Sequence, residues 1–152
     1  MPIDMDNMLP GFSSQLVATQ NAPISSNAGS GGGTDNTYLA TALLREEDIL
    51  DVGFTVTGVG SESSYTVVFQ SVGSETKAYT SSPTLVCTEA RGTVYRVSDG
   101  TISWAATADT EAKRRLKKGD SIQCVVDGTG HASCTIVPFV LMRGAEPLDP
   151  IA

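Results

Sequence analysis

Apolar residues occupy every second position along much of the chain after residue 36. In Leu50–Thr57 this alternation is strong, and side chains two residues apart on a strand point to the same face. Similar segments recur about every 8–12 residues, separated by turns rich in Gly, Pro, Asp and Ser. The sequence therefore predicts an all-β domain of about eight short strands, an antiparallel β-sandwich or jelly roll rather than a parallel α/β sheet.

Turn residues and alternation together place the individual elements. Trp104, the single tryptophan, is expected in the core. The pattern predicts a helix over Thr110–Lys118 alone. Strands are expected over residues 38–43, 50–57, 65–69, 85–88, 93–97, 101–106, 121–126, 132–137 and 139–143.

Two strand pairs carry strong hairpin signals. Asp99 and Gly100 separate the expected strands 93–97 and 101–106, and Asp-Gly is a preferred hairpin turn. A second hairpin is predicted about Thr129, because folding there places all the apolar residues of both strands on one buried face. The expected cross-strand pairs are Ile122 with Ile136, Cys124 with Cys134, and Val126 with Ala132.

The first 36 residues differ in composition from the rest. They are rich in Gly, Ser, Asn and Pro, sustain no regular periodicity, and contain a glycine-rich hinge at Gly29–Gly33. Their scattered apolar residues fit an arm that binds a neighbouring protein; a disordered terminus with incidental hydrophobic residues is the alternative. We predict an extended arm over 1–36, a β domain over 37–143 and a C-terminal tail over 144–152, whose prolines oppose another strand. The candidate anchors of the arm are Leu9, Phe12, Leu16, Val17 and Ile24.

Charge is acidic in sum and uneven in distribution. The net charge is −7, and the run Lys113–Lys118 holds half of the ten basic residues. An acidic chain argues against a general nucleic-acid-binding protein, because phosphate neutralisation needs a broad basic surface. The run itself has two interpretations: a solvated turn or short helix, or a contact with phosphate or with a partner's acidic patch.

No sequence signal directs the chain into or across a membrane. No apolar run reaches the roughly 20 residues of a membrane span, and the first residues lack the pattern of a signal peptide. We expect synthesis in a host cytoplasm, no membrane partner, and three cysteines that stay mostly reduced.

Residues able to support catalysis do not converge in the sequence. His131, the single histidine, falls in a turn, and Glu46–Asp48 are neighbours along one strand rather than an acid/base pair from separate elements. Cys87, Cys124 and Cys134 fall in strand interiors, which is typical of buried, unreactive thiols. We predict no catalytic residue, no metal site, no cofactor and no enzymatic activity; a Cys124–Cys134 disulfide stays an open alternative.

The segment Leu116–Ile122, with the apolar strand Thr135–Leu141 after it, resembles the penultimate hairpin region of jelly-roll trimers related to the complement C1q and tumour-necrosis-factor heads. Over its whole length the chain is more similar, by architecture and composition, to jelly-roll cement or decoration proteins of tailed bacteriophages. That resemblance implies a non-enzymatic virion protein on the outside of an assembled capsid. Its partners would be the major capsid protein and copies of itself, with a trimer favoured. The alternative is a tail-fibre, spike or lectin-like carbohydrate-binding domain.

Overall fold

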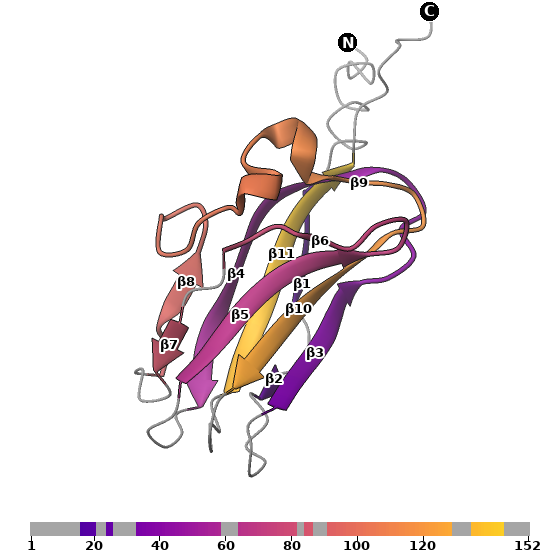
Figure 1. Cartoon of the computed structure of the whole chain (residues 1–152). Helices are drawn as coiled ribbons and strands as arrows, with labels where there is room; N and C mark the ends of the chain where they lie inside the picture. Colours follow the sequence, from indigo (N-terminus) through magenta and orange to yellow (C-terminus); the bar gives the residue numbers. More distant parts are fainter. Residues whose placement is uncertain are drawn as a thin grey trace, which may run out of the picture.

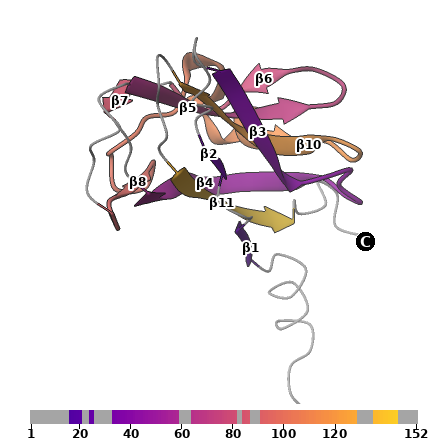
Figure 2. The ribbon, with the colours of Figure 1, turned by 90° about the horizontal axis from the view of Figure 1, so that it is seen from below.

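The computed structural model describes residues 16–20, 24–25, 33–58, 64–81, 84–86, 91–128 and 135–144. In these residues two antiparallel β-sheets form two layers, visible as a sandwich in Figure 1 and edge-on in Figure 2. The helical elements among them are two single turns of 3-10 helix. The all-β sandwich predicted from the alternating pattern is confirmed.

Eleven strands make up the two sheets in this part of the chain, and eight of them have three or more residues. The first sheet contains β1 (Leu16–Gln20), β2 (Ile24–Ser25), β4 (Glu47–Gly58), β8 (Val94–Arg96), β9 (Arg115–Leu116) and β11 (Thr135–Gly144). The second contains β3 (Gly33–Ala40), β5 (Ser64–Val72), β6 (Lys77–Ala78), β7 (Thr84–Val86) and β10 (Ser121–Gly128).

The order of the strands is that of a jelly roll. Working inward from the two ends of the chain, β1 pairs with β11, β3 with β10, β4 with β8, and β5 with β6 and β7. Nested pairs of this kind arise when one long antiparallel hairpin is rolled into two facing sheets. The predicted jelly roll is confirmed by this topology.

The hairpin predicted about Thr129 is wrong. β10 pairs with β3 and β5 in the second sheet, whereas β11 pairs with β1 and β4 in the first. Ile122 therefore lies opposite Ser71, and Ile136 lies opposite Val56, instead of opposite each other. Both strands bury one face in the same core, and a strand that crosses between sheets shows the same alternation as a strand that returns in a hairpin. The alternation was correct, but the pairing inferred from it was not.

The segment after β8 makes a turn as expected but no returning strand. Gly100 donates to the carbonyl oxygen of Val97 at 3.0 Å, and the Thr101 hydroxyl oxygen accepts the Arg96 N–H at 2.7 Å. Because the Arg96 N–H is bonded to this side chain, residues 101–106 do not form a strand beside β8. Their β-contact is an isolated bridge between Trp104 and Thr80. The 3-10 turn η1 (Ala106–Ala108) follows.

The helix predicted over Thr110–Lys118 is also wrong. Only the 3-10 turn η2 (Glu111–Arg114) forms, and β9 follows it directly. Leu116 in β9 is fully buried and pairs with Glu47 of β4. A helix of nine residues has little stability of its own, so burial of Leu116 decides the local structure.

Strands occur in the N-terminal segment, where none were expected. Leu16 of β1 lies opposite Arg143, Gln20 lies opposite Phe139, and Ile24 of β2 lies opposite Ile136. Part of the predicted arm thus supplies the outer strand of the jelly roll.

The core lies between the sheets and follows the alternation closely. Ile122, Cys124 and Val126 on β10 face Val52, Phe54 and other buried residues of β4 and β11, all of them at most 2% exposed. Trp104 only packs against the edge of this core and is partly buried. Each fully buried aliphatic side chain contributes about 1.5–3 kcal/mol to the hydrophobic stabilisation.

Candidate interaction surface

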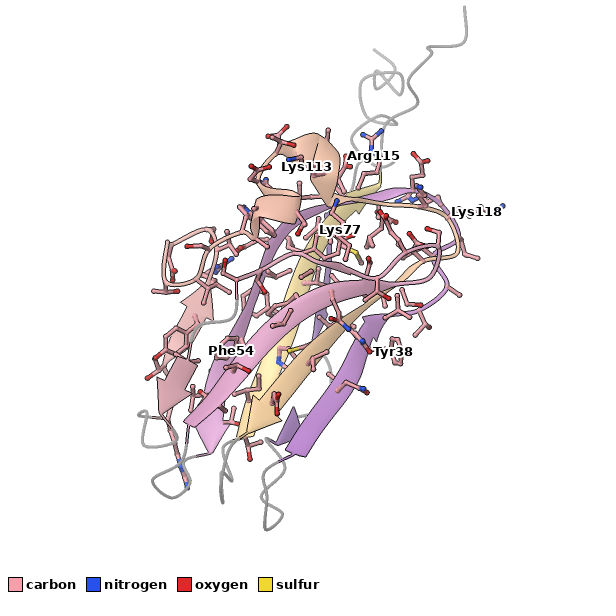
Figure 3. All side chains as sticks on the ribbon, in the orientation of Figure 1. Tyr38, Phe54, Lys77, Lys113, Arg115 and Lys118 are labelled. Atoms are coloured by element: carbon pink, nitrogen blue, oxygen red, sulfur yellow. The ribbon has the colours of Figure 1, made fainter. Side chains whose placement is uncertain are left out.

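Eight of the ten basic residues lie at one end of the sandwich, where Figure 3 labels Lys77, Lys113, Arg115 and Lys118. Five of them belong to the run seen in the sequence, and the fold adds three from other elements. We call this region the basic end. Its members are Arg45, Lys77, Lys113, Arg114, Arg115, Lys117, Lys118 and Arg143.

Asp120 fixes the connections that meet at the basic end. Its side chain is buried, its Oδ1 accepts hydrogen bonds from the Ser74 N–H (3.1 Å) and hydroxyl (3.2 Å), and its Oδ2 accepts the Lys117 N–H (3.2 Å). Gly73 has φ +155°, and a side chain there would collide with the Asp120 carboxylate. One carboxylate therefore holds the β5–β6 and β9–β10 connections together.

The β3–β4 connection presents an exposed leucine. Leu44 is 90% exposed, yet the backbone beside it is fixed: Leu43 donates to the Asp120 carbonyl oxygen at 2.9 Å, and Ala42 donates to Ser121 Oγ at 3.0 Å. Ala42 has φ +46°, a left-handed conformation that is unfavourable for a residue other than glycine. The fold thus holds a large apolar side chain in water on a strained and well-anchored loop.

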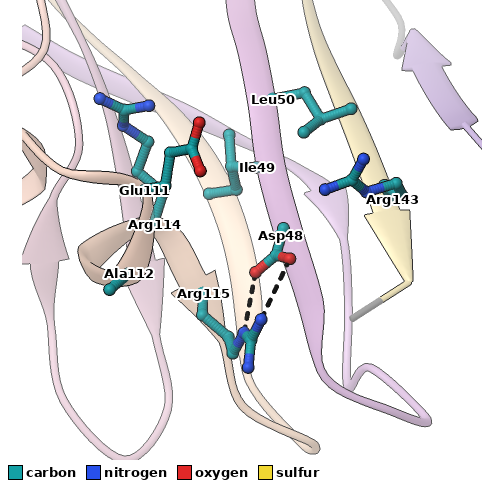
Figure 4. Close-up of a pocket in the computed structure, with 8 residues that line it drawn as sticks. All are labelled: Asp48, Ile49, Leu50, Glu111, Ala112, Arg114, Arg115 and Arg143. Atoms are coloured by element: carbon teal, nitrogen blue, oxygen red, sulfur yellow. Dashed lines mark hydrogen bonds and ion pairs between the residues drawn. The ribbon is translucent and has the colours of Figure 1, made fainter. Parts of the chain in front are cut away.

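A hollow of about 450 Å³ opens beside β4 and η2 (Figure 4). Asp48 lies between Arg143 of β11 and Arg115 of β9 in the backbone register. Arg115 donates two hydrogen bonds to Asp48, at 2.9 and 3.3 Å, and these bonds raise the pKa of the Arg115 guanidinium. Ile49 and Leu50 add apolar lining.

Most cations of the basic end are already engaged within the protein. Arg45 pairs with Glu47 and Lys113 with Asp109, and the Lys113 hydrogen bond lowers the pKa of the Asp109 carboxyl. Arg114 lies over the Trp104 ring at 4.2 Å from its centroid and donates to two backbone carbonyl oxygens; Lys77 donates to the Lys113 carbonyl oxygen. Three cations make no hydrogen bond or ion pair with any described residue: Lys117, Lys118 and Arg143.

Both terminal segments attach at the same end. Leu16, where the described chain begins, lies opposite Arg143, and β11 ends one residue later at Gly144. The candidate anchors Leu9 and Phe12 lie outside the described residues. Leu16 and Val17 pair with Arg143 and Met142 near one end of β11, whereas Ile24 pairs with Ile136 near the other end, so the structure does not bring these three candidates together.

Of the other residues singled out in the sequence, those that the structure describes form no second site. Cys124 is a free, buried thiol, and burial raises its pKa, as expected for a structural cysteine. Cys87, Cys134 and His131 lie outside the described residues. Among the residues described, no three His, Cys, Asp or Glu side chains gather as a metal would require. No helix described here is long and apolar enough to span a membrane.

Leu44 and Arg143 were not recognised as surface candidates in the sequence. Leu44 follows Leu43, and two adjacent leucines give no indication of which one is buried. Arg143 is 25 residues or more from the basic run, and only the pairing of β11 with β4 brings it there. The long-range topology was the missing information.

No protein-family model matches the chain, and no curated protein matches its sequence. Solved structures with a remote likeness include two of infectious bursal disease virus. One, "Structure of infectious bursal disease virus Gx strain", aligns with 91% of this chain and 35% of that chain at 11% identity and a TM-score of 0.46. The other, "Crystal structure of infectious bursal disease virus VP2 subviral particle", aligns with 88% and 42% at 10% identity and a TM-score of 0.27. The chain thus spans well under half of either neighbour, and scores this low carry no argument about family or function.

Proposed function

We propose that this chain is a structural virion protein, without enzymatic activity, that binds the outside of an assembled tailed-bacteriophage capsid through its basic end. The observation that carries the proposal is what gathers there: three cations without a partner among the described residues, the exposed Leu44, and the attachment points of both terminal segments. An apolar side chain framed by charges is the composition of a binding hot spot and its rim.

The partner that fits this end is the major capsid protein, with an acidic surface around an apolar depression. Lys117, Lys118 and Arg143 would contact the acidic rim, and Leu44 would enter the depression. Repetition of the contact over the lattice supplies avidity, so each copy needs only a modest affinity. Binding to the assembled shell alone would stabilise it, because the shell cannot open without losing these contacts.

The N-terminal arm is proposed to make a second contact with the same capsid protein. Leu9 and Phe12 precede β1 and would extend from the basic end onto the capsid surface. A chain that starts at Gln15 removes both residues and keeps β1, so it should fold like the full chain. It should bind capsids more weakly, since each apolar side chain contributes about 1.5–3 kcal/mol when fully buried. Capsid binding equal to that of the full chain would reject a binding role for the arm.

Co-sedimentation with assembled heads of the same virus tests the proposal. The full chain should pellet with heads, should remain in solution with unassembled capsid subunits, and should raise the temperature at which heads rupture. The variant Lys117→Glu, Lys118→Glu, Arg143→Glu should bind at least about 100-fold more weakly, since three reversals at about 1 kcal/mol each add to about 3 kcal/mol.

Arg91→Glu is the control, because Arg91 is exposed beside the opposite end of β4, where Gly92 donates to Val56. It should bind heads like the unmodified chain. Equal binding by the triple variant and the control, with both folded, would contradict the proposal.

A further inference from the structure

The outward face of the second sheet carries almost no charge. Two neighbouring rows of residues cross β3, β10 and β5 on this face, as the backbone register shows. Among its described outward positions on these three strands, the single charge is Asp127, at the end of β10. We call five of these residues the uncharged face: Asn36, Tyr38, Val68, Gln70 and Val125. Gln123, between Tyr38 and Gln70 in the register, is buried at 7% exposure.

Burial shows which way these side chains point. Val67 and Phe69 on β5 are at most 2% exposed and belong to the core, so Val68 between them points away from it. On β10, Val125 is flanked in the same way by buried neighbours. Tyr38 is 45% exposed and the adjacent Leu39 is buried, so Tyr38 points away from the core; Figure 3 labels it beside β3.

The first sheet is different on its outward side. There Arg115 pairs with Asp48, Arg96 pairs with Asp51, and Arg143 has no described partner. The Arg96 guanidinium also lies over the Phe139 ring, at 5.2 Å from its centroid. The described outward positions of β3, β10 and β5 thus carry one charge, Asp127, whereas the first sheet carries the five charged residues just named.

We propose that the uncharged face binds a second copy of this chain, sheet against sheet, as a twofold dimer. Two copies that each carry a net charge of −7 repel, and an interface with no charged side chain avoids placing like charges in contact. In a twofold interface each face meets itself. The amides of Asn36 and Gln70 suit this arrangement because each has both donors and acceptors, whereas a charged group would meet its own sign.

The composition of the face agrees with a second copy as its occupant. Interface centres are depleted of charge and enriched in tyrosine, and here Tyr38 and the valines lie beside neutral amides. Two sheets pack face to face at about 10 Å, which side chains of this size can fill. A trimer, by contrast, needs two different contact surfaces on each copy.

The size of the face sets the strength of the contact. Three strands about 4.8 Å apart, with the eight residues of β10 at about 3.3 Å each, cover roughly 400 Å² per copy. Two copies would bury roughly 800 Å², which is below the roughly 1,000 Å² of a stable specific interface and in the range of a transient one. The dimer should therefore be weak and concentration-dependent in solution. This contact does not depend on capsid binding, which uses the basic end.

Sedimentation velocity of the full chain over a concentration series tests the inference. The mass should rise from that of one chain to that of two. Tyr38→Glu and Gln70→Glu each bury a charge of each copy in the interface, and this adds to the repulsion between two acidic chains, so each should raise the dissociation constant at least about tenfold. The matched control is Val94→Glu on β8 of the first sheet, because Val94 is 40% exposed and apolar; it should dimerise like the unmodified chain.

Three results would overturn the inference: a chain that is monomeric at every concentration, a particle of three copies, or equal dimerisation of Tyr38→Glu and Val94→Glu. A monomer that binds a glycan in a Tyr38-dependent manner would likewise show that the face has another occupant. Circular dichroism of each variant establishes that it is folded. Tyr38→Glu should still bind phage heads, so the failure of this inference and the failure of the proposed function give different results.

Discussion

The basic end and the uncharged face are built from different parts of the same fold. The basic end consists mainly of connections between strands, held by Asp120, and its exposed groups are cations and Leu44. The uncharged face consists of strand residues whose alternate neighbours form the core. Cations on connections suit an acidic foreign partner, while neutral amides on a flat sheet suit a copy of the same acidic chain. The jelly roll thus places the two proposed contacts, which would conflict on one surface, in different parts of the molecule.

Both regions depend on the packing of one core, so the largest expected effect is on folding. Adjacent residues of β10 point to opposite faces of the second sheet and can be compared directly. Val126→Asp places an unpaired charge in a site that is 1% exposed, at a cost of several kcal/mol against a typical stability of 5–15 kcal/mol. Val126→Asp should be unfolded or insoluble. Val125→Asp, one residue earlier on the outward side, should fold and should lose only self-association.

Circular dichroism and urea denaturation of the two variants distinguish these outcomes. A folded Val126→Asp protein together with an unfolded Val125→Asp protein would show that the register of β10 is shifted by one residue, which exchanges the two faces.

The sequence predicts a feature of these regions well when the feature depends on residues close together in the chain, and poorly when it depends on residues far apart. Alternation is local, so Ile122, Cys124 and Val126 were correctly predicted to share a buried face. Strand pairing is not local: the residues opposite Cys124 are Thr37 and Phe69, more than 50 positions away. A jelly roll sends most consecutive strands to opposite sheets, so pairing each strand with its sequence neighbour fails at β10 and β11.

The two surface regions follow the same rule. The run Lys113–Lys118 was visible in the sequence, but the addition of Arg143 to it needs the pairing of β11 with β4. The uncharged face likewise needs the register of β3, β10 and β5, because Tyr38 and Gln70 lie in separate segments. Tyr38 fits a strand in either orientation, and only the burial of Leu39 beside it decides which side is outward.

The second-largest effect is expected from removing the Asp120 carboxylate, which should weaken capsid binding and leave dimerisation unchanged. Asp120→Ala loses three hydrogen bonds that fix two connections of the basic end, and net losses of about 0.5–1.5 kcal/mol per bond add to about 1.5–4.5 kcal/mol. Hydrogen exchange should rise at Ser74 and Lys117, capsid binding should weaken, and dimerisation should stay unchanged once the protein is folded.

Asp120→Asn is the matched control, since it keeps one acceptor oxygen. Its free energy of unfolding should lie between those of the unmodified chain and of Asp120→Ala. If Asp120→Ala weakens dimerisation as much as capsid binding, the two regions are not independent.

Salt should divide the two contacts without any mutation. Raising the ionic strength from about 0.05 M to about 0.5 M shortens the screening length from more than 10 Å to less than 5 Å. Capsid binding through Lys117, Lys118 and Arg143 should fall by about tenfold or more. Dimerisation should stay constant or strengthen, because screening reduces the repulsion between two chains of net charge −7. The same dependence on salt for both, measured by sedimentation, would show that both contacts use the same surface.

The smallest effect on stability is expected at the most exposed apolar residue. Leu44 is 90% exposed, so Leu44→Ala removes almost no buried area, and its free energy of unfolding should change by less than about 0.5 kcal/mol. Capsid binding should nevertheless fall several-fold, because in the complex the same side chain enters a pocket on the partner. Val94→Ala, on β8 of the first sheet, is the control, and it should change neither stability nor capsid binding by a measurable amount. A Leu44→Ala protein that binds capsids like the Val94→Ala control would mean that the basic end acts through its charges alone. The strain at Ala42 would then have no role in binding, and Ala42→Gly, which relieves the positive φ, should stabilise the loop without any loss of capsid affinity.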